Sequence, residues 1–209
     1  MLVSRWNSKM GILPSFSLPP IKTCPGRSPF CGQFCYGLRG RLAWVRLREI
    51  QEANLEASQQ DDFIKRMGRE IARLRSEAFR LHVVGDFYSA DYVEKWVEIA
   101  SSFPDMIFFG STRSWRVPSL ESAVEMFAAL PNARMRASID FTHEDRPDPG
   151  WKVISVEDDG VSCPHDYGWV QDCSGCRRCW QSKVSLRLKL RWPGGVRNLR
   201  QIPLPEAGK

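Results

Sequence analysis

The 209-residue sequence has no apolar run approaching the roughly 18 residues that a membrane span needs, which excludes a spanning helix. Its first residues lack the continuous apolar core and small-residue cleavage site of a secretory signal, so we expect a cytoplasmic, intracellular protein with no membrane partner. No internal repeat or low-complexity segment stands out. The 43% apolar and 26% charged residues are typical of a globular chain.

The sequence has few histidines, and its cysteines are not spread along the chain as the pairs of a disulfide framework would be. The sequence has three histidines, His82, His143 and His165, and none of them lies near the first cysteines. The seven cysteines are an odd number gathered in two tight groups. In a reducing compartment this pattern favours metal ligation over a disulfide framework.

The net charge of +6 is unevenly distributed. Residues 1–180 hold 23 Lys and Arg against 23 Asp and Glu, so this part is neutral. The final segment has one acid, Glu206, against seven basic residues: Lys183, Arg187, Lys189, Arg191, Arg197, Arg200 and Lys209. A basic tail of this kind can contact nucleic acid through phosphates, although a solvated end that aids solubility is the commoner explanation.

Hydrophobic periodicity predicts alternating strands and helices. A short strand is predicted within residues 12–23, ending at Pro19 and Pro20. Further strand patterns cover residues 79–87, 106–114, 133–141 and 151–157, with a sixth candidate at 185–192. Helical patterns cover 41–60, 63–78, 89–103 and 119–130, with a break at 60–62 and with Ser89 and Ser119 as N-caps. Strands separated by helices of this length indicate an α/β fold with a mostly parallel sheet.

The first cysteine group is Cys24, Cys31 and Cys35, in a loop that follows the first predicted strand. Three cysteines in this C-x6-C-x3-C spacing are one ligand short of a closed zinc site or of a fully ligated iron-sulfur cluster. Three thiolates on a cluster would leave one iron free to bind a substrate or cofactor. The alternatives are a zinc ion completed by a distant residue and reduced thiols without metal.

The second cysteine group provides a complete set of four ligands. It has the spacing C-x9-C-x2-C-x2-C and consists of Cys163, Cys173, Cys176 and Cys179. Consecutive C-x2-C steps favour a second iron-sulfur cluster, and a structural zinc is the alternative. A site with four protein ligands serves structure or electron transfer.

Four motifs of this chain resemble, in order, those of the radical S-adenosylmethionine (SAM) superfamily over residues 12–157. They are the three-cysteine loop, Phe34 before Cys35, the pair Gly85-Asp86 and the strand Ser138-Ile139-Asp140. More narrowly, the chain resembles the phage family called gene product 88 in its Cys-Tyr, Gly-Asp-Phe, Phe-Gly-Ser-Thr-Arg-Ser and Cys-Trp motifs. The cysteine spacing departs from the commoner C-x3-C-x2-C, and Val84-Gly85-Asp86 stands in place of Gly-Gly-Glu.

The superfamily resemblance implies a fold and a site. Residues 1–160 would form a partial parallel (β/α) barrel with the cysteine loop at 24–35, and residues 161–209 would hold the second cysteine group and the basic tail. The first group would bind a [4Fe-4S] cluster whose free iron is chelated by SAM. The residues expected to contact SAM are Phe34 through its backbone, Gly85 and Asp86 at the amino group, and Ser138 and Asp140 at the ribose or carboxylate.

Other residues carry two interpretations each. Arg113 ends a strand where a pocket is expected, so it is a candidate for binding an anionic group, and a surface turn is the alternative. Asp86 has the alternative role of capping the next helix. Trp44 and Trp96 occupy helical positions and are predicted to lie in the core.

The resemblance implies a radical SAM enzyme that reductively cleaves SAM to a 5'-deoxyadenosyl radical. Such an enzyme needs an external electron donor, and its substrate is not specified by the sequence, with a nucleotide or nucleic acid as a candidate. One alternative is a non-enzymatic protein in which zinc or iron-sulfur stabilises a nucleic-acid-binding fold. Another is an iron-sulfur electron carrier with two fully ligated clusters.

Overall fold

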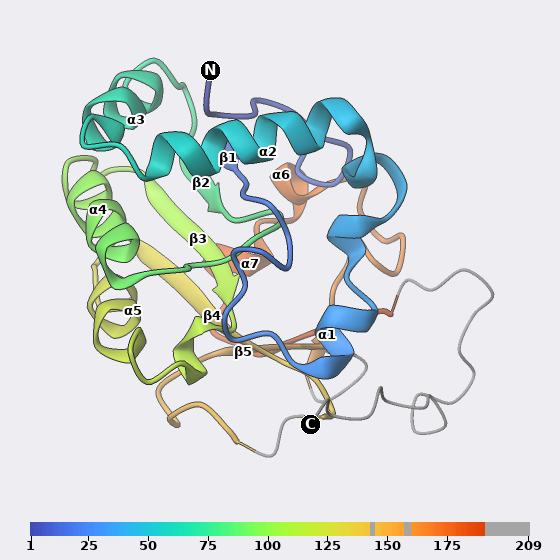
Figure 1. Cartoon of the computed structure of the whole chain (residues 1–209). Helices are drawn as coiled ribbons and strands as arrows, with labels where there is room; N and C mark the ends of the chain where they lie inside the picture. The colour runs from blue at the N-terminus through green and yellow to red at the C-terminus, as the bar shows by residue number, and fades with distance from the viewer. Residues whose placement is uncertain (143–144, 157–159, 191–209) are drawn as a thin grey trace.

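A seven-stranded, all-parallel sheet organises the chain in a computed structural model that describes residues 1–142, 145–156 and 160–190 (Figure 1). The strand order is β1-β2-β3-β4-β5-β7-β6, so the first five strands follow one another in sequence and in space. The strands are β1 (Ser15–Phe16), β2 (Ala78–Leu81), β3 (Ile107–Thr112), β4 (Ala133–Ile139), β5 (Val153–Val156), β6 (Val161–Ser162) and β7 (Leu186–Leu188).

Four helices of at least two turns connect the early strands. They are α2 (Val45–Ser58), α3 (Phe63–Ile71), α4 (Ala90–Ser101) and α5 (Glu121–Ala128). Shorter turns of helix are α1 (Pro29–Gln33), η1 (Tyr36–Leu38), η2 (Gly40–Ala43), η3 (Ser114–Arg116), α6 (Cys173–Cys176) and α7 (Arg178–Gln181). None of the helices in the described part of the chain is long and apolar enough to cross a membrane.

The two faces of the sheet are buried by different parts of the chain. Neighbouring residues of β3 point to opposite faces, as strand geometry requires. Phe108 faces a core of α3, α4 and α5 side chains that includes Trp96 and Phe127. Phe109 faces the other way and packs on Trp180, with ring centroids 4.5 Å apart. The C-terminal cysteine segment therefore covers the sheet face opposite the long helices.

The predicted α/β class and parallel sheet are confirmed. Ser89 caps α4 by accepting a hydrogen bond from Tyr92 N (3.3 Å), as predicted. The two-residue β6 was not anticipated, and the candidate strand near 185–192 is present as β7. Because β6 and β7 belong to the same sheet, the segment after residue 160 shares its framework with the segment before it.

Several predicted details are wrong. The strand at 79–87 ends at Leu81, since the apolar residues that follow are buried in an irregular segment. Leu120, not Ser119, is the N-cap of α5. Part of the cysteine loop is helical, as α1, η1 and η2. Trp44 is 61% exposed because it precedes α2 at its N-cap position, whereas Trp96 is in the core as predicted.

Candidate functional site

The candidate site lies where the parallel strands end. Cys24–Cys35 follows β1, Asp86 follows β2, Arg113 follows β3 and Asp140 follows β4. Carboxyl ends of parallel strands meet at one edge of the sheet, which is where open α/β folds bind ligands. The sequence-predicted residues from four separate segments therefore come to the same edge.

Helix α1 gives the cysteine loop its shape. Ser28 is its N-cap and accepts a hydrogen bond from Cys31 N (3.0 Å), and Pro29 occupies the first turn, where no amide hydrogen is needed. Phe30 packs on Phe34 and on Phe141 after β4, with ring centroids 4.8 and 4.9 Å apart. The loop is thus fastened to the edge of the sheet by aromatic contacts as well as by the cap.

The three thiols of this group are half-buried and close enough to influence one another. Burial, together with the nearby Asp86 carboxylate and the thiols of Cys31 and Cys35, raises the pKa of Cys24 to about 12. Burial also raises the pKa of Cys31, whereas the Arg113 guanidinium lowers it. The site therefore disfavours free thiolates, which a bound cation would stabilise.

No group of three or more Cys, His, Asp or Glu side chains converges on a single metal-ion position in residues 1–142, 145–156 and 160–190. An iron-sulfur cluster requires a different arrangement of its ligands. Each cysteine ligates a different iron, so the sulfurs need not meet at one point. The first group fits a [4Fe-4S] cluster in ligand type and in number, with three soft thiol donors on one short segment.

Asp140 is the centre of a buried network beside the cysteines. It is fully buried, and its Oδ2 accepts hydrogen bonds from Ser28 Oγ (2.6 Å) and Arg113 Nη1 (2.8 Å). Its Oδ1 accepts from the backbone amide and hydroxyl of Thr142. Since Ser28 also caps α1, this carboxylate connects the ends of β3 and β4 to the helix that carries Cys31.

Asp86 also accepts hydrogen bonds from neighbouring groups of the protein. Its Oδ1 accepts from Thr112 Oγ1 (2.6 Å) and from Phe87 N (2.8 Å), and its Oδ2 accepts from Arg113 N (2.7 Å). Burial raises its pKa, and these three hydrogen bonds oppose that shift. Asp86 does not cap the next helix, which Ser89 does, and its Oδ2 retains acceptor capacity for a ligand.

The remaining predicted ligand residues have structural contacts of their own. Gly85 has φ +81°, and a Cβ there would lie 2.6 Å from Leu18 Cβ. Glycine is therefore required at this position, where the chain passes the segment after β1. Phe34 N donates to Phe30 O (2.9 Å). Ser138 is half-buried and its carbonyl accepts from Trp115 Nε1 (3.3 Å). Their predicted contacts with SAM stay predictions.

The second cysteine group lies on α6, α7 and the segment before them, against the sheet face that carries Phe109. Cys163 and Cys173 are buried, and Cys176 and Cys179 are half-buried. Asp172 caps α6 by accepting from Gly175 N (3.2 Å), and Cys173 N donates to Lys9 O (2.8 Å). The group is therefore attached to both the sheet and the N-terminal segment.

Basic side chains surround this second group. Burial raises the pKa of Cys173 to about 12, and Lys9 and Arg80 act in the opposite direction. Burial raises the pKa of Cys179 as well, while Arg80, Arg136 and Lys9 lower it. These cations would stabilise thiolates or an anionic cluster, as hydrogen bonds and charge near cluster sulfurs do in general.

Arg136 is a residue that the sequence analysis missed. It lies on β4 and is almost fully buried. Its guanidinium donates to the carbonyls of Cys179 (3.1 Å), Ser182 (2.9 Å) and Val184 (2.6 Å). An arginine inside a strand of a parallel sheet was the available signal, since an unpaired buried charge is costly.

Part of the basic tail lies outside the described residues, namely Arg191, Arg197, Arg200, Lys209 and the nearby Trp192. Within the described part, Arg187 Nη2 donates to Ser162 Oγ (2.9 Å), which joins β7 to β6. This tail arginine has a role within the protein.

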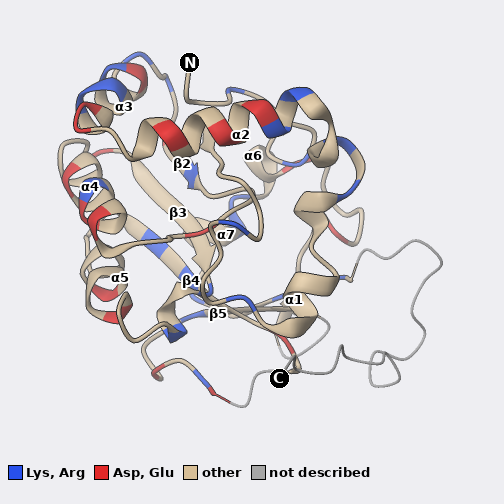
Figure 2. Ribbon diagram, viewed as in Figure 1, with Lys and Arg blue, Asp and Glu red and all other residues tan. Residues whose placement is uncertain are grey.

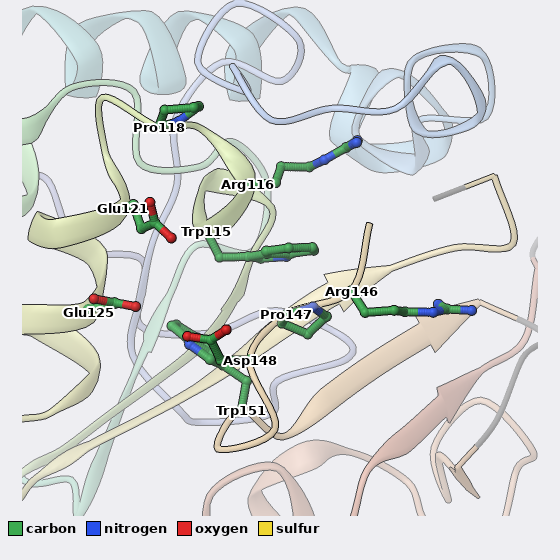
Figure 3. A pocket seen from close by; sticks show the side chains of 9 residues that line it. All are labelled: Trp115, Arg116, Pro118, Glu121, Glu125, Arg146, Pro147, Asp148 and Trp151. Carbon is green, nitrogen blue, oxygen red and sulfur yellow. The ribbon is translucent and has the colours of Figure 1, made fainter. Parts of the chain in front are cut away.

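A separate pocket of about 190 Å³ lies between η3, the start of α5 and residues 146–151 (Figure 3). Trp115 and Trp151 line it together with arginines and carboxylates, and no cysteine borders it. Arg116 at its rim forms a two-point ion pair with Asp145 (2.7 and 2.9 Å). The pocket is thus distinct from both cysteine groups.

Comparison with known proteins gives two kinds of match. A family model described as "Gene product 88" matches residues 2–182. Two relatives, both named "Gene 88 protein" and from Mycobacterium phages D29 and L5, are each 30% identical over 125 residues, which is 51% of this chain and 50% of theirs. The chain thus spans about half the length of the curated relatives it matches. No solved structure matches.

Proposed function

We propose that this chain, which belongs to the gene product 88 family, is a radical SAM enzyme in which Cys24, Cys31 and Cys35 bind a [4Fe-4S] cluster. The cluster, when bound, supplies the electron that cleaves SAM to methionine and a 5'-deoxyadenosyl radical. An external donor must provide that electron, and the radical would abstract a hydrogen atom from a substrate.

The observation that carries this proposal is the position of the three thiols. They lie together at the carboxyl edge of a parallel sheet, within electrostatic range of Asp86 and Arg113. Three cysteine ligands leave one iron of a four-iron cluster without a protein ligand, which is the requirement for binding a small molecule there. The sequential order of β1 to β5 is consistent with a partial (β/α) barrel, whose functional sites occupy this edge.

The protein's own groups have defined tasks in this proposal. Asp86 offers a carboxylate to an ammonium group near Cys24, and three protein donors fix its orientation. Asp140 and Arg113 form a buried ion pair that holds Ser28, and through it the start of α1. The cysteine loop is therefore pre-shaped before a cofactor arrives, which reduces the entropy lost on binding.

The second cysteine group, in this proposal, holds a fully ligated [4Fe-4S] cluster; a zinc ion, the alternative, would require its four sulfurs to move onto one position, where the described residues do not bring them. Three of its thiols, those of Cys163, Cys173 and Cys179, influence one another electrostatically. Its position on the sheet face opposite the long helices suits a role in structure or electron transfer.

The direct test measures iron, sulfide and zinc in anaerobically purified protein, with electron paramagnetic resonance spectra of the reduced sample with and without SAM. The proposal expects about four or eight irons per chain and a spectrum that SAM perturbs. Zinc alone, with no effect of SAM, would reject it in favour of a metal-stabilised binding protein. Two full clusters that SAM leaves unperturbed would instead indicate an electron carrier.

Two matched triple variants separate the cysteine groups. Replacing Cys24, Cys31 and Cys35 by Ala should remove about four irons and abolish the SAM effect. Replacing Cys163, Cys173 and Cys179 by Ala should preserve the SAM effect. If the second variant, correctly folded by circular dichroism, lost the SAM effect and the first kept it, the assignment of the two sites would be wrong.

A further inference from the structure

Acidic residues are absent from the whole beginning of the chain. Glu49 is the first Asp or Glu in the sequence, and the 48 residues before it contain eight Lys and Arg. The neutral balance of residues 1–180 therefore conceals a basic part and an acidic part. Four of the eight cations are concentrated at 39–48, immediately after the first cysteine group: Arg39, Arg41, Arg46 and Arg48.

These arginines form an exposed surface, here called the basic-aromatic surface and consisting of residues 36–48. Arg41, Arg46 and Arg48 are exposed, and none of them takes part in an ion pair within the described chain. Figure 2 shows basic residues at the beginning of α2 and acidic residues further along it. Three exposed arginines between residues 41 and 48, without an ion pair in the described chain, create a local positive field that attracts a polyanion.

Two aromatic rings belong to the same surface. Trp44 is 61% exposed and Tyr36 is 55% exposed, so both rings are accessible to a partner. The Tyr36 hydroxyl donates to the backbone oxygen of Val83, which fixes the position of the ring. Aromatic rings that are held in place lose little entropy when a flat partner stacks on them.

The combination of arginines and exposed aromatic rings indicates the class of partner. Phosphates would pair with the arginines, and bases would stack on the two rings, as in proteins that bind single strands. A duplex keeps its bases stacked on one another, so it can use the arginines but not the rings. We propose that the basic-aromatic surface binds single-stranded nucleic acid, with Arg41, Arg46 and Arg48 at the phosphates and Trp44 and Tyr36 at the bases.

This inference goes beyond the proposed enzyme activity and does not depend on a cluster. The two sites are adjacent along the chain, because Cys35 is the N-cap of η1, the first element of the basic-aromatic surface. A strand bound at residues 36–48 would lie beside the candidate cofactor site. It also places the nucleic-acid contact in the N-terminal quarter of the chain and not in the basic tail.

The test measures binding of fluorescein-labelled 20-nucleotide single-stranded DNA and RNA to the full chain by fluorescence anisotropy, in 50 to 200 mM salt. The affinity is expected to fall steeply with salt, with a log-log slope that decreases in magnitude by about 2 when Arg41, Arg46 and Arg48 are all replaced by Gln. That variant should bind at least tenfold more weakly. Trp44→Ala should weaken single-strand binding about tenfold, and Trp44→Phe should retain most of it.

Two controls share the charge change of the triple variant. Replacing the exposed Arg66, Arg69 and Arg73 of the α3 region by Gln should leave affinity within about twofold in 200 mM salt, where long-range attraction is screened. A variant with Arg191, Arg197 and Arg200 replaced by Gln tests the basic tail in the same way. Circular dichroism and the melting temperature confirm that each variant is folded.

Three results would overturn the proposal. The first is equal loss of affinity in the α3 control and in the surface variant, which would mean nonspecific attraction. The second is loss of binding in the tail variant alone. The third is duplex binding as tight as single-strand binding together with no effect of Trp44→Ala, which would remove the stacking contact. The same binding measurements on metal-free protein should give the same affinities for single strands. Failure of the radical SAM proposal would therefore leave this proposal standing, and failure of this one would leave the radical SAM proposal standing.

Discussion

At the scale of single residues, the most consequential group is the buried carboxylate of Asp140. It accepts hydrogen bonds from a serine that caps α1, from an arginine after β3 and from Thr142. A buried charge of this kind is tolerated because both of its oxygens accept hydrogen bonds and an arginine pairs with it. Removing its charge would take from the buried Arg113 guanidinium the carboxylate that it contacts at 2.8 Å.

Asp140→Asn should therefore destabilise the fold by about 3–5 kcal/mol, as expected when one partner of a buried ion pair is removed. The matched control is Asp145→Asn, which breaks the partly exposed pair with Arg116 and should cost less than about 1 kcal/mol. Denaturant unfolding monitored by tryptophan fluorescence measures both. Equal losses would show that burial of the Arg113–Asp140 pair is unimportant.

Two glycines of the cysteine loop provide a second residue-scale prediction. A Cβ at Gly26 would lie 2.1 Å from the backbone oxygen of Arg113, whereas a Cβ at Gly32 would meet nothing closer than 3.9 Å. Gly26→Ala should push the loop away from β3 and cost about 1–3 kcal/mol. Gly32→Ala, inside α1, should be neutral or slightly stabilising.

Thermal unfolding and the iron content of the reconstituted protein report on these two variants. Gly26→Ala should lower both the melting temperature and the iron bound at the first cysteine group. A Gly26→Ala variant as stable and as iron-rich as Gly32→Ala would contradict the close approach of the loop to Arg113.

At the scale of elements, the C-terminal cysteine segment depends on one strand residue. Arg136 on β4 satisfies three carbonyls at and after the end of α7, where helix carbonyls lack intrahelical partners. A short helix such as α7 has little stability of its own, so its position depends on such external donors.

Arg136→Lys should loosen this segment, because an ammonium cannot reach three carbonyls with the geometry of a planar guanidinium. We expect a loss of at least about 2 kcal/mol and faster amide hydrogen exchange confined to residues 173–184. Arg134→Lys is the control, since Arg134 is exposed and bonds only to neighbouring carbonyls of Pro131 and Ala133. Unchanged exchange in the Arg136 variant would rule out this anchoring role.

Element-scale features were the most predictable from sequence. The strand β3 and the helix α4 with Ser89 at its cap follow from periodicity and capping alone. The end of β2 does not, because Val84 and Phe87 continue the apolar run while lying in a buried irregular segment. The convergence of Asp86 and Asp140 follows from parallel strand ends. The contact of Asp140 with Ser28 could not be predicted, since it joins side chains 112 positions apart.

At the scale of the whole molecule, one core histidine couples global stability to pH. His82 is buried among aromatic rings, with Phe87 5.0 Å away between centroids, and its Nε2 lies 2.8 Å from the Tyr92 hydroxyl. Burial and the nearby Arg80 cation lower the pKa of His82 to about 3. The folded protein therefore keeps this imidazole neutral where the unfolded chain, with a pKa of about 6.5, becomes charged.

The sign of the effect follows from proton uptake by the unfolded state. As the pH falls below about 6.5, unfolding takes up a proton at His82, so stability should decrease by up to about 1.4 kcal/mol per pH unit until about pH 3. His82→Gln removes this contribution while keeping a polar partner for Tyr92. Denaturant unfolding at pH 7 and pH 5 should show a smaller loss in the variant, and identical pH dependence would refute the assignment.

The hydrogen bond between Cys173 N and Lys9 O also has a consequence for protein synthesis. The ribosome makes Lys9 long before Cys173, and β7 must then insert between β5 and β6. Contacts between such distant parts form slowly and only after the intervening chain has emerged. The second cysteine group is therefore completed after the first, and a nascent chain stalled before residue 173 carries the whole first group and Cys163 alone of the second.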